Sequence, residues 1–326
     1  MGTPEDPTPG WTPGPGTDPD LAASYALCRR LTKEHGKTYY LATRLLPAAK
    51  RPSVYALYGL ARYADEIVDD LGDSSGPAER KGRLGRFADT VLRDLARGES
   101  THPVGRAVVD TATRWSVDRE LFEAFFASMA MDLTLTQYAT WADLGGYVFG
   151  SAAVIGLQML PVLEPVTDDP AQLDAVSCAA RDLGVAFQLA NFIRDVGEDL
   201  DRGRVYLPLA DLAAAGLTRA DLERRIVDDR VRALLAFEIG RVHALRDSAA
   251  AGIPLLHPTS RPCIAAALSM YCGIADRVAA ADYQVFRIRA TVPLPVRLAT
   301  AGRAWRDVRA AGRRDRDWER VAARTG

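Results

Sequence analysis

The segment Gln188–Asp199 constrains the fold more than any other, because its polar and apolar residues separate onto different faces of one helix. Steps of three, four and four residues place four polar side chains on one face: Gln188, Asn191, Asp195 and Asp199. The other faces are apolar, with Leu189, Ala190, Phe192, Ile193 and Val196. A polar face on a buried helix needs polar partners or a solvated cavity. The segment therefore predicts a core helix that carries polar side chains into an internal site.

The acidic residues of this segment lie where a helix tolerates them least. Asp195, Glu198 and Asp199 fall in the last turns before Gly203, which we interpret as the end of the helix. Acids at this end oppose the helix dipole, and like charges four residues apart repel by roughly a few tenths of a kcal/mol per pair. We therefore expect a cation to compensate for this charge.

A second stretch, earlier in the chain, repeats the arrangement. Steps of four, three and four residues place another polar set on one face of an otherwise apolar helix: Tyr58, Arg62, Asp65 and Asp69. Four acids crowd the end of this helix, just before Gly72: Asp65, Glu66, Asp69 and Asp70. Solvated helix ends would explain either stretch alone. The pair favours two acidic helices that face each other across a central cavity.

Magnesium fits such a cavity, since it takes oxygen ligands and is usually held by one or two carboxylates plus substrate phosphates. We expect the metal ligands to be Asp65, Asp69, Asn191, Asp195 and Asp199, with Mn²⁺ as an alternative to Mg²⁺. Groups suited to a diphosphate lie nearby. They are His35, Lys37 and Thr38 around the helix breaker Gly36, then Arg62, Arg194, Arg204 and Tyr206. An ordinary polar loop remains an alternative for His35–Thr38.

Composition narrows the function classes. The chain has 326 residues, 48% hydrophobic residues and a net charge of −1, which suits a globular protein and argues against a nucleic-acid partner. The four cysteines lack paired spacing and are interpreted as core residues of a reduced, cytoplasmic protein. The sequence predicts neither a signal peptide nor an apolar span of eighteen residues. It does not define the oligomeric state.

The pattern along the chain predicts one all-α domain. Residues 1–19 are expected to form a disordered leader rich in proline and glycine, residues 20–310 the helical domain, and residues 311–326 an arginine-rich tail. The tail and its tryptophans are interpreted as a solvated helix face, with a weak contact to a membrane surface as the alternative. Helices are expected at about 21–34, 51–70, 78–97, 103–115, 119–135, 141–160, 171–200, 209–214, 219–225, 228–250, 261–285 and 294–309.

Several features leave two interpretations open. Asp132, followed six residues later by Tyr138, fits a capping or packing role at least as well as a functional one. The small residues of Tyr147–Gly156 permit either close helix packing or a channel for a long apolar ligand, and Gly184 is expected to leave room for such a chain. A third acidic group is interpreted as a surface feature because arginines are interleaved with it: Asp221, Glu223, Asp228 and Asp229.

The two acidic stretches resemble the two aspartate-rich motifs of the phytoene/squalene synthase family. Four further segments share this likeness: residues 35–47, 55–58, 147–156 and 202–208. The likeness covers about Ser24 to Val292 and implies a single-domain isoprenoid-synthase helical fold with a central cavity. Two positions depart from the family pattern. Glu66 stands where aspartate is common, and Phe286-Arg287-Ile288-Arg289 replaces the usual Phe-x-Arg-Arg, so the roles of Arg287 and Arg289 are undefined.

The resemblance implies head-to-head condensation of two prenyl diphosphates through a cyclopropyl diphosphate, with phytoene from two geranylgeranyl diphosphates as the first choice. Asp65, Asp69, Asp195, Asp199, Tyr58 and Tyr147 are the expected catalytic residues, and Gln188, Asn191 and Tyr271 join the expected substrate-binding set. The alternatives are a squalene or dehydrosqualene synthase using farnesyl diphosphate, a cyclase of similar fold, and a non-catalytic helical assembly factor. No nucleotide-binding motif is present, so NADPH is not expected.

Overall fold

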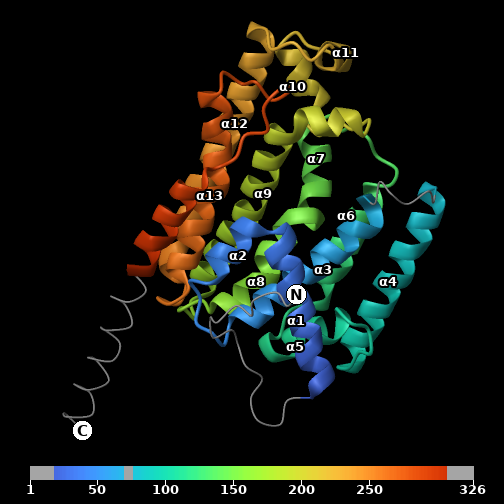
Figure 1. Cartoon of the computed structure of the whole chain (residues 1–326), viewed down its shortest axis with the longest axis vertical. Helices are drawn as coiled ribbons and strands as arrows, with labels where there is room; N and C mark the ends of the chain where they lie inside the picture. The colour runs from blue at the N-terminus through green and yellow to red at the C-terminus, as the bar shows by residue number, and fades with distance from the viewer. Residues whose placement is uncertain (1–17, 70–75, 307–326) are drawn as a thin grey trace, which may run out of the picture.

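The computed structural model describes residues 18–69 and 76–306, and within these ranges it contains no β-strand, only two isolated bridges. The prediction of an all-α chain is confirmed (Figure 1). The elements in chain order are α1 (Pro19–His35), α2 (Lys37–Thr43), α3 (Arg51–Asp69), α4 (Pro77–Arg97), α5 (Gly105–Trp115), α6 (Arg119–Met131), α7 (Trp141–Val148), the π-helix η1 (Phe149–Ala153), α8 (Val154–Leu163), α9 (Pro170–Asp201), α10 (Leu209–Ala214), α11 (Arg219–Glu223), α12 (Asp229–Gly252), η2 (Ile253–Leu255) and α13 (Arg261–Ala280).

The expected helices correspond to the observed ones, and the differences have local causes. The chain breaks at Gly36, as predicted, but continues directly into α2. Asp18, whose side chain accepts from the backbone N–H of Asp20, begins α1 two residues earlier than expected. At the other end, α13 stops at Ala280 because Asp282 and Tyr283 adopt left-handed backbone angles. A final helix covers residues 294–306. The predicted leader and tail lie almost entirely outside the described residues.

Helix α9 lies at the centre of the bundle, where it packs on α12, α13, α8 and η1 (Figure 1). Its apolar residues are buried as the sequence predicts, with Leu189, Ala190, Phe192 and Ile193 at 5% exposure or less. Helix α3 packs between α1, α5 and α4, and its Leu57 and Leu60 are fully buried. The two acidic motifs are therefore held by two core helices.

The structure corrects the role expected for the small residues. A Cβ atom on Gly184 would lie 2.3 Å from the carbonyl oxygen of Ala152, and one on Gly156 would lie 2.0 Å from that of Ala180. Both glycines thus allow α9 to approach η1 and α8 backbone to backbone. Gly184 was expected to leave room for a substrate chain. It does border the cavity described below, but any larger side chain would displace the facing helix instead of filling the cavity.

Two further expectations need correction. Two helical stretches, Trp141–Leu163 and Arg261–Ala280, are long and apolar enough to span a membrane by composition, although no such span was expected. In each stretch, 56% of an apolar window of 18 residues is buried inside the structure, as in the core helices of a globular bundle. Among the four cysteines, Cys178 is exposed, whereas Cys28, Cys263 and Cys272 are buried as predicted.

Candidate active site

An apolar cavity runs through the middle of the bundle. Together with the open solvent at its mouth, it contains about 1310 Å³ of space free of protein atoms. Aliphatic and aromatic side chains form most of its wall: Leu46, Val54, Ile155, Met159, Leu160, Leu163, Val176, Leu183, Phe187, Ile253, Leu256 and Ile264. A long apolar ligand therefore has a site in this fold.

Both core helices border this cavity just before their acidic residues. Tyr58 and Ala61 of α3 contribute to the wall, as do Gln188 and Asn191 of α9. Asp65 follows Ala61 by one helical turn, and Asp195 follows Asn191 by one turn. We infer that the two acidic motifs flank the same end of the cavity, as the spacing of the polar residues predicts.

The first motif is balanced by an arginine of its own helix. Nη1 of Arg62 donates to Oδ2 of Asp65 at 2.8 Å, and its Nε donates to Oε1 of Glu66 at 3.1 Å. His35 approaches the same Glu66 oxygen at 3.7 Å. Gly36 brings this segment close, because a Cβ atom there would lie 2.6 Å from the Tyr58 ring. The side chain of Asp69 and all of Asp70 lie outside the described part of the structure.

The second motif is balanced by two arginines. Arg194 pairs with Asp195 through Nε at 2.7 Å and through Nη2, and Nε of Arg289 donates to the same carboxylate at 3.0 Å. Arg289 also pairs with Glu198 at 2.8 Å. Burial alone would raise the pKa of Asp195, but the two guanidinium groups outweigh it and lower the pKa below the usual range. The expected compensating cation is thus partly supplied by the chain itself.

Three aromatic rings line the cavity beside these motifs, those of Tyr39, Tyr58 and Phe187, and the buried ring of Tyr271 packs against two of them. Tyr39 contacts Tyr58 and Tyr271 at centroid distances of 5.4 and 4.7 Å, and Phe187 stacks on Tyr271 at 4.4 Å. Burial raises the pKa of Tyr271 far above its usual range, and the charge of Arg194 opposes this shift, as does that of Arg297. The ring contacts thus join Tyr58 of α3 and Phe187 of α9 through Tyr39 of α2 and Tyr271 of α13.

Asp132 accepts hydrogen bonds from two of the expected site tyrosines. Tyr147 donates to its Oδ2 at 2.7 Å, and Tyr206 donates to its Oδ1 at 2.9 Å. Arg204 donates to its backbone carbonyl at 3.1 Å, and the Tyr206 ring stacks on Phe192 at 4.2 Å. Burial and Asp132 both raise the pKa of Tyr147, so this phenol stays protonated. Asp132, which the sequence left undecided, fixes two tyrosines beside the second motif.

The remaining expected residues have less defined surroundings. Lys37 is exposed at the beginning of α2, Thr38 is half-buried next to it, and Asp199 is half-buried in the last turn of α9. Gln188 and Asn191 border the cavity directly. Arg289 is the contact that sequence reasoning did not assign, since 94 residues separate it from Asp195. Its only signal was a departure from the usual family motif.

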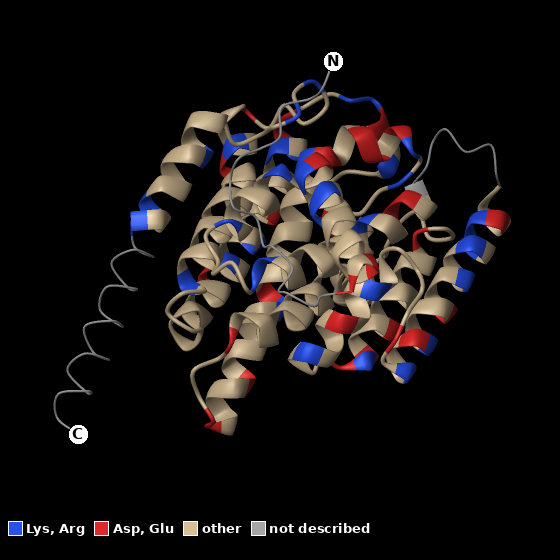
Figure 2. Cartoon of the chain, turned by 60° about the horizontal axis from the view of Figure 1, so that its bottom comes forward, with Lys and Arg blue, Asp and Glu red and all other residues tan. Residues whose placement is uncertain are grey.

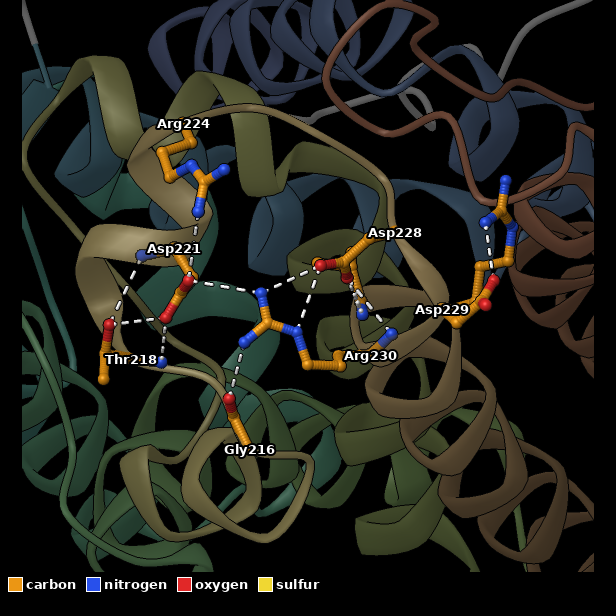
Figure 3. Close-up of polar contacts among 9 residues, drawn as sticks. Gly216, Thr218, Asp221, Arg224, Asp228, Asp229 and Arg230 are labelled. Carbon is orange, nitrogen blue, oxygen red and sulfur yellow. Dashed lines mark hydrogen bonds and ion pairs between the residues drawn. The ribbon is translucent and has the colours of Figure 1, made fainter.

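The third acidic group is a closed surface network, as predicted (Figure 3). Arg230 donates to Asp228 at 2.9 Å and to Asp221 at 3.3 Å, and Arg224 approaches Asp221 at 3.7 Å. Asp221 also forms the capping box of α11 with Thr218, while Asp228 caps α12. These carboxylates serve helix ends and arginines, and none of them lines the apolar cavity.

The oxygen donors of the two motifs fit a magnesium ion that arrives together with a diphosphate. No group of three potential ligands is preassembled among the described residues. Magnesium does not require one, because it is commonly held by one or two carboxylates, water and substrate phosphates. Asp65, Asn191 and Asp195 offer only hard oxygen donors at the end of an apolar cavity, which is the donor type this ion prefers.

Solved structures first define the class of fold. A dehydrosqualene synthase superposes on 89% of this chain and 98% of its own, with a TM-score of 0.79 at 25% identity. A squalene synthase of Alicyclobacillus acidocaldarius superposes on 81% and 96% of the two chains, with a TM-score of 0.71 at 27% identity. The bundle with its central cavity is the helical fold of these enzymes.

Sequence comparison then defines the family. The profile of squalene/phytoene synthase matches residues 32–296, so the chain belongs to this family. A phytoene synthase of Arthrospira platensis is 39% identical over 83% of this chain and 88% of its own. A 15-cis-phytoene synthase of Synechocystis is 36% identical over 90% of this chain and 88% of its own. The family resemblance inferred from the acidic motifs is confirmed.

Proposed function

We propose that this chain condenses two molecules of geranylgeranyl diphosphate head to head to give phytoene. The observation that carries the proposal is a long apolar cavity bordered by two core helices, each of which becomes acidic one turn beyond the cavity wall. A prenyl tail fits the cavity, and a diphosphate with its metal fits the acidic end. Relatives named phytoene synthase, 36–39% identical over most of both chains, support the choice of product.

Loss of diphosphate from an allylic carbon needs its developing charge to be stabilised. Bound Mg²⁺ would supply Lewis-acid stabilisation to the leaving diphosphate, with Asp65, Asp69, Asn191, Asp195 and Asp199 as its proposed ligands. Arg62, Arg194 and Arg204 lie beside these residues and supply fixed positive charge. We propose that His35, Lys37 and Thr38 bind the second diphosphate, because Gly36 seats this segment against Tyr58.

The carbocation must then be shielded from water and stabilised. The apolar wall excludes water, and the ring faces of Tyr39, Tyr58 and Tyr271 stabilise a cation by about 0.5–2 kcal/mol each. Burial raises the pKa of Tyr58 to about 12, so its phenol stays neutral at physiological pH. The double bond of the second substrate attacks the cation, and loss of a proton leaves a cyclopropyl diphosphate. Departure of the second diphosphate, rearrangement and loss of another proton give the hydrocarbon.

A squalene or dehydrosqualene synthase acting on farnesyl diphosphate is the second candidate, since the solved relatives carry those names. Phytoene formation needs no reductant, in agreement with the absence of a nucleotide-binding motif from the sequence. We place the enzyme in the cytoplasm. A non-catalytic assembly factor is disfavoured because both acidic motifs are complete in the sequence.

Product analysis with each substrate tests the proposal. Purified protein with Mg²⁺ should convert geranylgeranyl diphosphate to phytoene with a higher kcat/KM than it shows for farnesyl diphosphate. Excess chelator should abolish turnover, and Mg²⁺ or Mn²⁺ should restore it. A preference for farnesyl diphosphate would establish the second candidate instead. Failure to consume either substrate, in a folded protein with metal, would contradict both.

A further inference from the structure

Charged residues are spread over the helices of the bundle (Figure 2), but only three in the described ranges are buried. They are Lys50 and Asp94, each 6% exposed, and Glu238, which is fully buried. Asp94 and Glu238 pair with arginines near them in the chain. Lys50 instead pairs with Glu164, and its Nζ donates to Oγ of Ser260, 210 positions away, at 3.0 Å. A buried ammonium is costly unless it is paired and hydrogen-bonded, and this one joins three distant segments.

Helix α9 fixes the direction of the apolar cavity. Asn191, Leu183 and Val176 all line it, and Val176 lies about 22 Å from Asn191 along α9, at roughly 1.5 Å per residue. Asn191 lies one turn before Asp195 and therefore marks the acidic end. Val176 marks the opposite end, which we call the far end. A prenyl chain whose diphosphate lies at the acidic end extends toward the far end.

Helix α8 leads to the same far end. Gly184 of α9 lies against Ala152, and Ala180 of α9 lies against Gly156, so α8 runs in the direction opposite to α9. Leu163, the last residue of α8, therefore lies near the far end, and it lines the cavity. The acid of the buried ion pair is the next residue in the chain.

The other two members of the ion-pair cluster also lie next to residues that line the cavity. Lys50 lies midway in the chain between Leu46 and Val54. Ser260 begins α13 and follows Leu256 by one turn. Leu46, Val54 and Leu256 are all buried, at 1%, 4% and 4% exposure. The cluster therefore lies directly behind the apolar residues of the far end.

Backbone groups of the same residues are fixed from behind. Nε of Arg51 donates to the carbonyl of Leu46 at 2.8 Å, and Nε of Arg261 donates to the carbonyl of Leu256 at 2.7 Å. An isolated bridge between Pro165 and Leu256 joins the chain after α8 to the chain before α13. The far end is thus an apolar wall supported by a polar layer.

We propose that the ion pair of Lys50 with Glu164, together with Ser260, holds this wall in place and so limits the length of the prenyl chain that the cavity accepts. Lys50 does not line the cavity, so it is a positioning residue that acts through Leu46 and Leu163. A chain that is too long presses on a closely packed wall and binds weakly, because such a wall yields little. The choice of geranylgeranyl diphosphate as the substrate that fits rests on the proposed function.

Calorimetric titration with non-reactive analogues tests the length limit without turnover. The probes are the thiodiphosphate analogues of geranylgeranyl diphosphate and of geranylfarnesyl diphosphate, which is one prenyl unit longer, added to the purified full-length protein with Mg²⁺. Wild-type protein should bind the longer analogue at least ~10-fold more weakly. Equal binding of the two would overturn the proposal, and binding of neither would contradict the proposed function as well. Discrimination by length without any formation of phytoene would contradict the proposed function alone.

Four variants separate the ion pair from general effects on the fold. Lys50→Met removes the charge at similar side-chain volume and should narrow the difference between the two analogues to about threefold or less. Lys50→Arg keeps a cation for Glu164 and should retain the wild-type discrimination. Leu163→Ala shortens the wall itself and should narrow the difference as well. Glu238→Gln is the matched control, because it weakens a buried ion pair with Arg241 whose members do not line the cavity, and it should leave the discrimination unchanged.

Circular dichroism establishes that each variant is folded. If Lys50→Met does not fold, Glu164→Ala removes the same ion pair from its half-exposed side and should narrow the difference in the same direction. A folded variant without the ion pair that discriminates like wild type would show that the pair serves stability alone. Equal loss of discrimination in Glu238→Gln would also overturn the proposal, because any loosening of the bundle would then explain the effect.

Discussion

The two acidic motifs have the same helical spacing but are neutralised in different ways. On α3, Asp65 and Glu66 are about 40% exposed and are paired with Arg62 of the same helix, within one turn. On α9, Asp195 is 16% exposed and contacts both its neighbour Arg194 and the distant Arg289. The first motif is thus balanced by local sequence, and the second depends on where the C-terminal segment packs.

This difference predicts that equivalent substitutions affect catalysis alike but stability unequally. Asp65→Ala and Asp195→Ala should each lower turnover by about 10²-fold or more, since each removes a carboxylate that we propose as a ligand of the metal. Steady-state kinetics with saturating Mg²⁺ measures the effect. If either variant keeps near-wild-type turnover, that acid is only a helix end.

The free energy of unfolding should separate the same two variants. Asp65→Ala should change it by less than about 1 kcal/mol, because an exposed pair contributes little. Asp195→Ala should lower it by about 1–3 kcal/mol, because two guanidinium groups lose a mostly buried partner. Repulsion from the helix dipole and from neighbouring acids would, taken alone, predict that both variants hold or gain stability, because a repelled acid is removed. Urea denaturation of both variants measures these free energies of unfolding. Equal losses in the two variants would show that the contact between Arg289 and Asp195 contributes nothing to stability.

A double-mutant cycle sharpens the comparison at the level of one contact. Arg289→Ala combined with Asp195→Ala should show a coupling energy of about 0.5–1 kcal/mol in the unfolding free energy, with the half-exposed position of Arg289 limiting its size. Arg289→Ala combined with Asp65→Ala should be additive, because Asp65 pairs with Arg62 of its own helix whereas Arg289 pairs with Asp195 and Glu198 of α9. Coupling in the second cycle would mean that both motifs respond to the C-terminal segment together.

The smallest effect on turnover is expected from the third acidic group, which serves as the control for acidic character alone. Asp221→Asn and Asp228→Asn should leave turnover within about twofold of wild type, since their partners are arginines and helix ends on the surface. A thermal melt should show a modestly lower midpoint, because Arg230 loses its ion pairs with both carboxylates, while asparagine still caps a helix about as well as aspartate. A large loss of turnover would contradict the assignment of these residues to the surface network.

Much of the protein was predictable from sequence, because helix positions and the polar face of each helix depend on residues close together in the chain. Helical periodicity identified the core helices, and the steps of three and four residues identified the polar faces of Tyr58–Asp69 and Gln188–Asp199. The interleaved arginines identified Asp221 and Asp228 as surface residues. The fold class and the family are confirmed, while the roles of the individual site residues stay predictions.

Only the tertiary structure decided which distant residues meet. Arg289 contacts Asp195, from which it is separated by 94 positions in the sequence. Asp132 accepts hydrogen bonds from Tyr147 of α7 and from Tyr206 in the segment after α9. Gly184 borders the cavity, yet the facing backbone of Ala152 leaves no room for a larger side chain at this position. Each outcome depends on the separation of packed helices, which periodicity does not contain. Sequence by itself determined which face of a helix is polar, and packing determined what that face contacts.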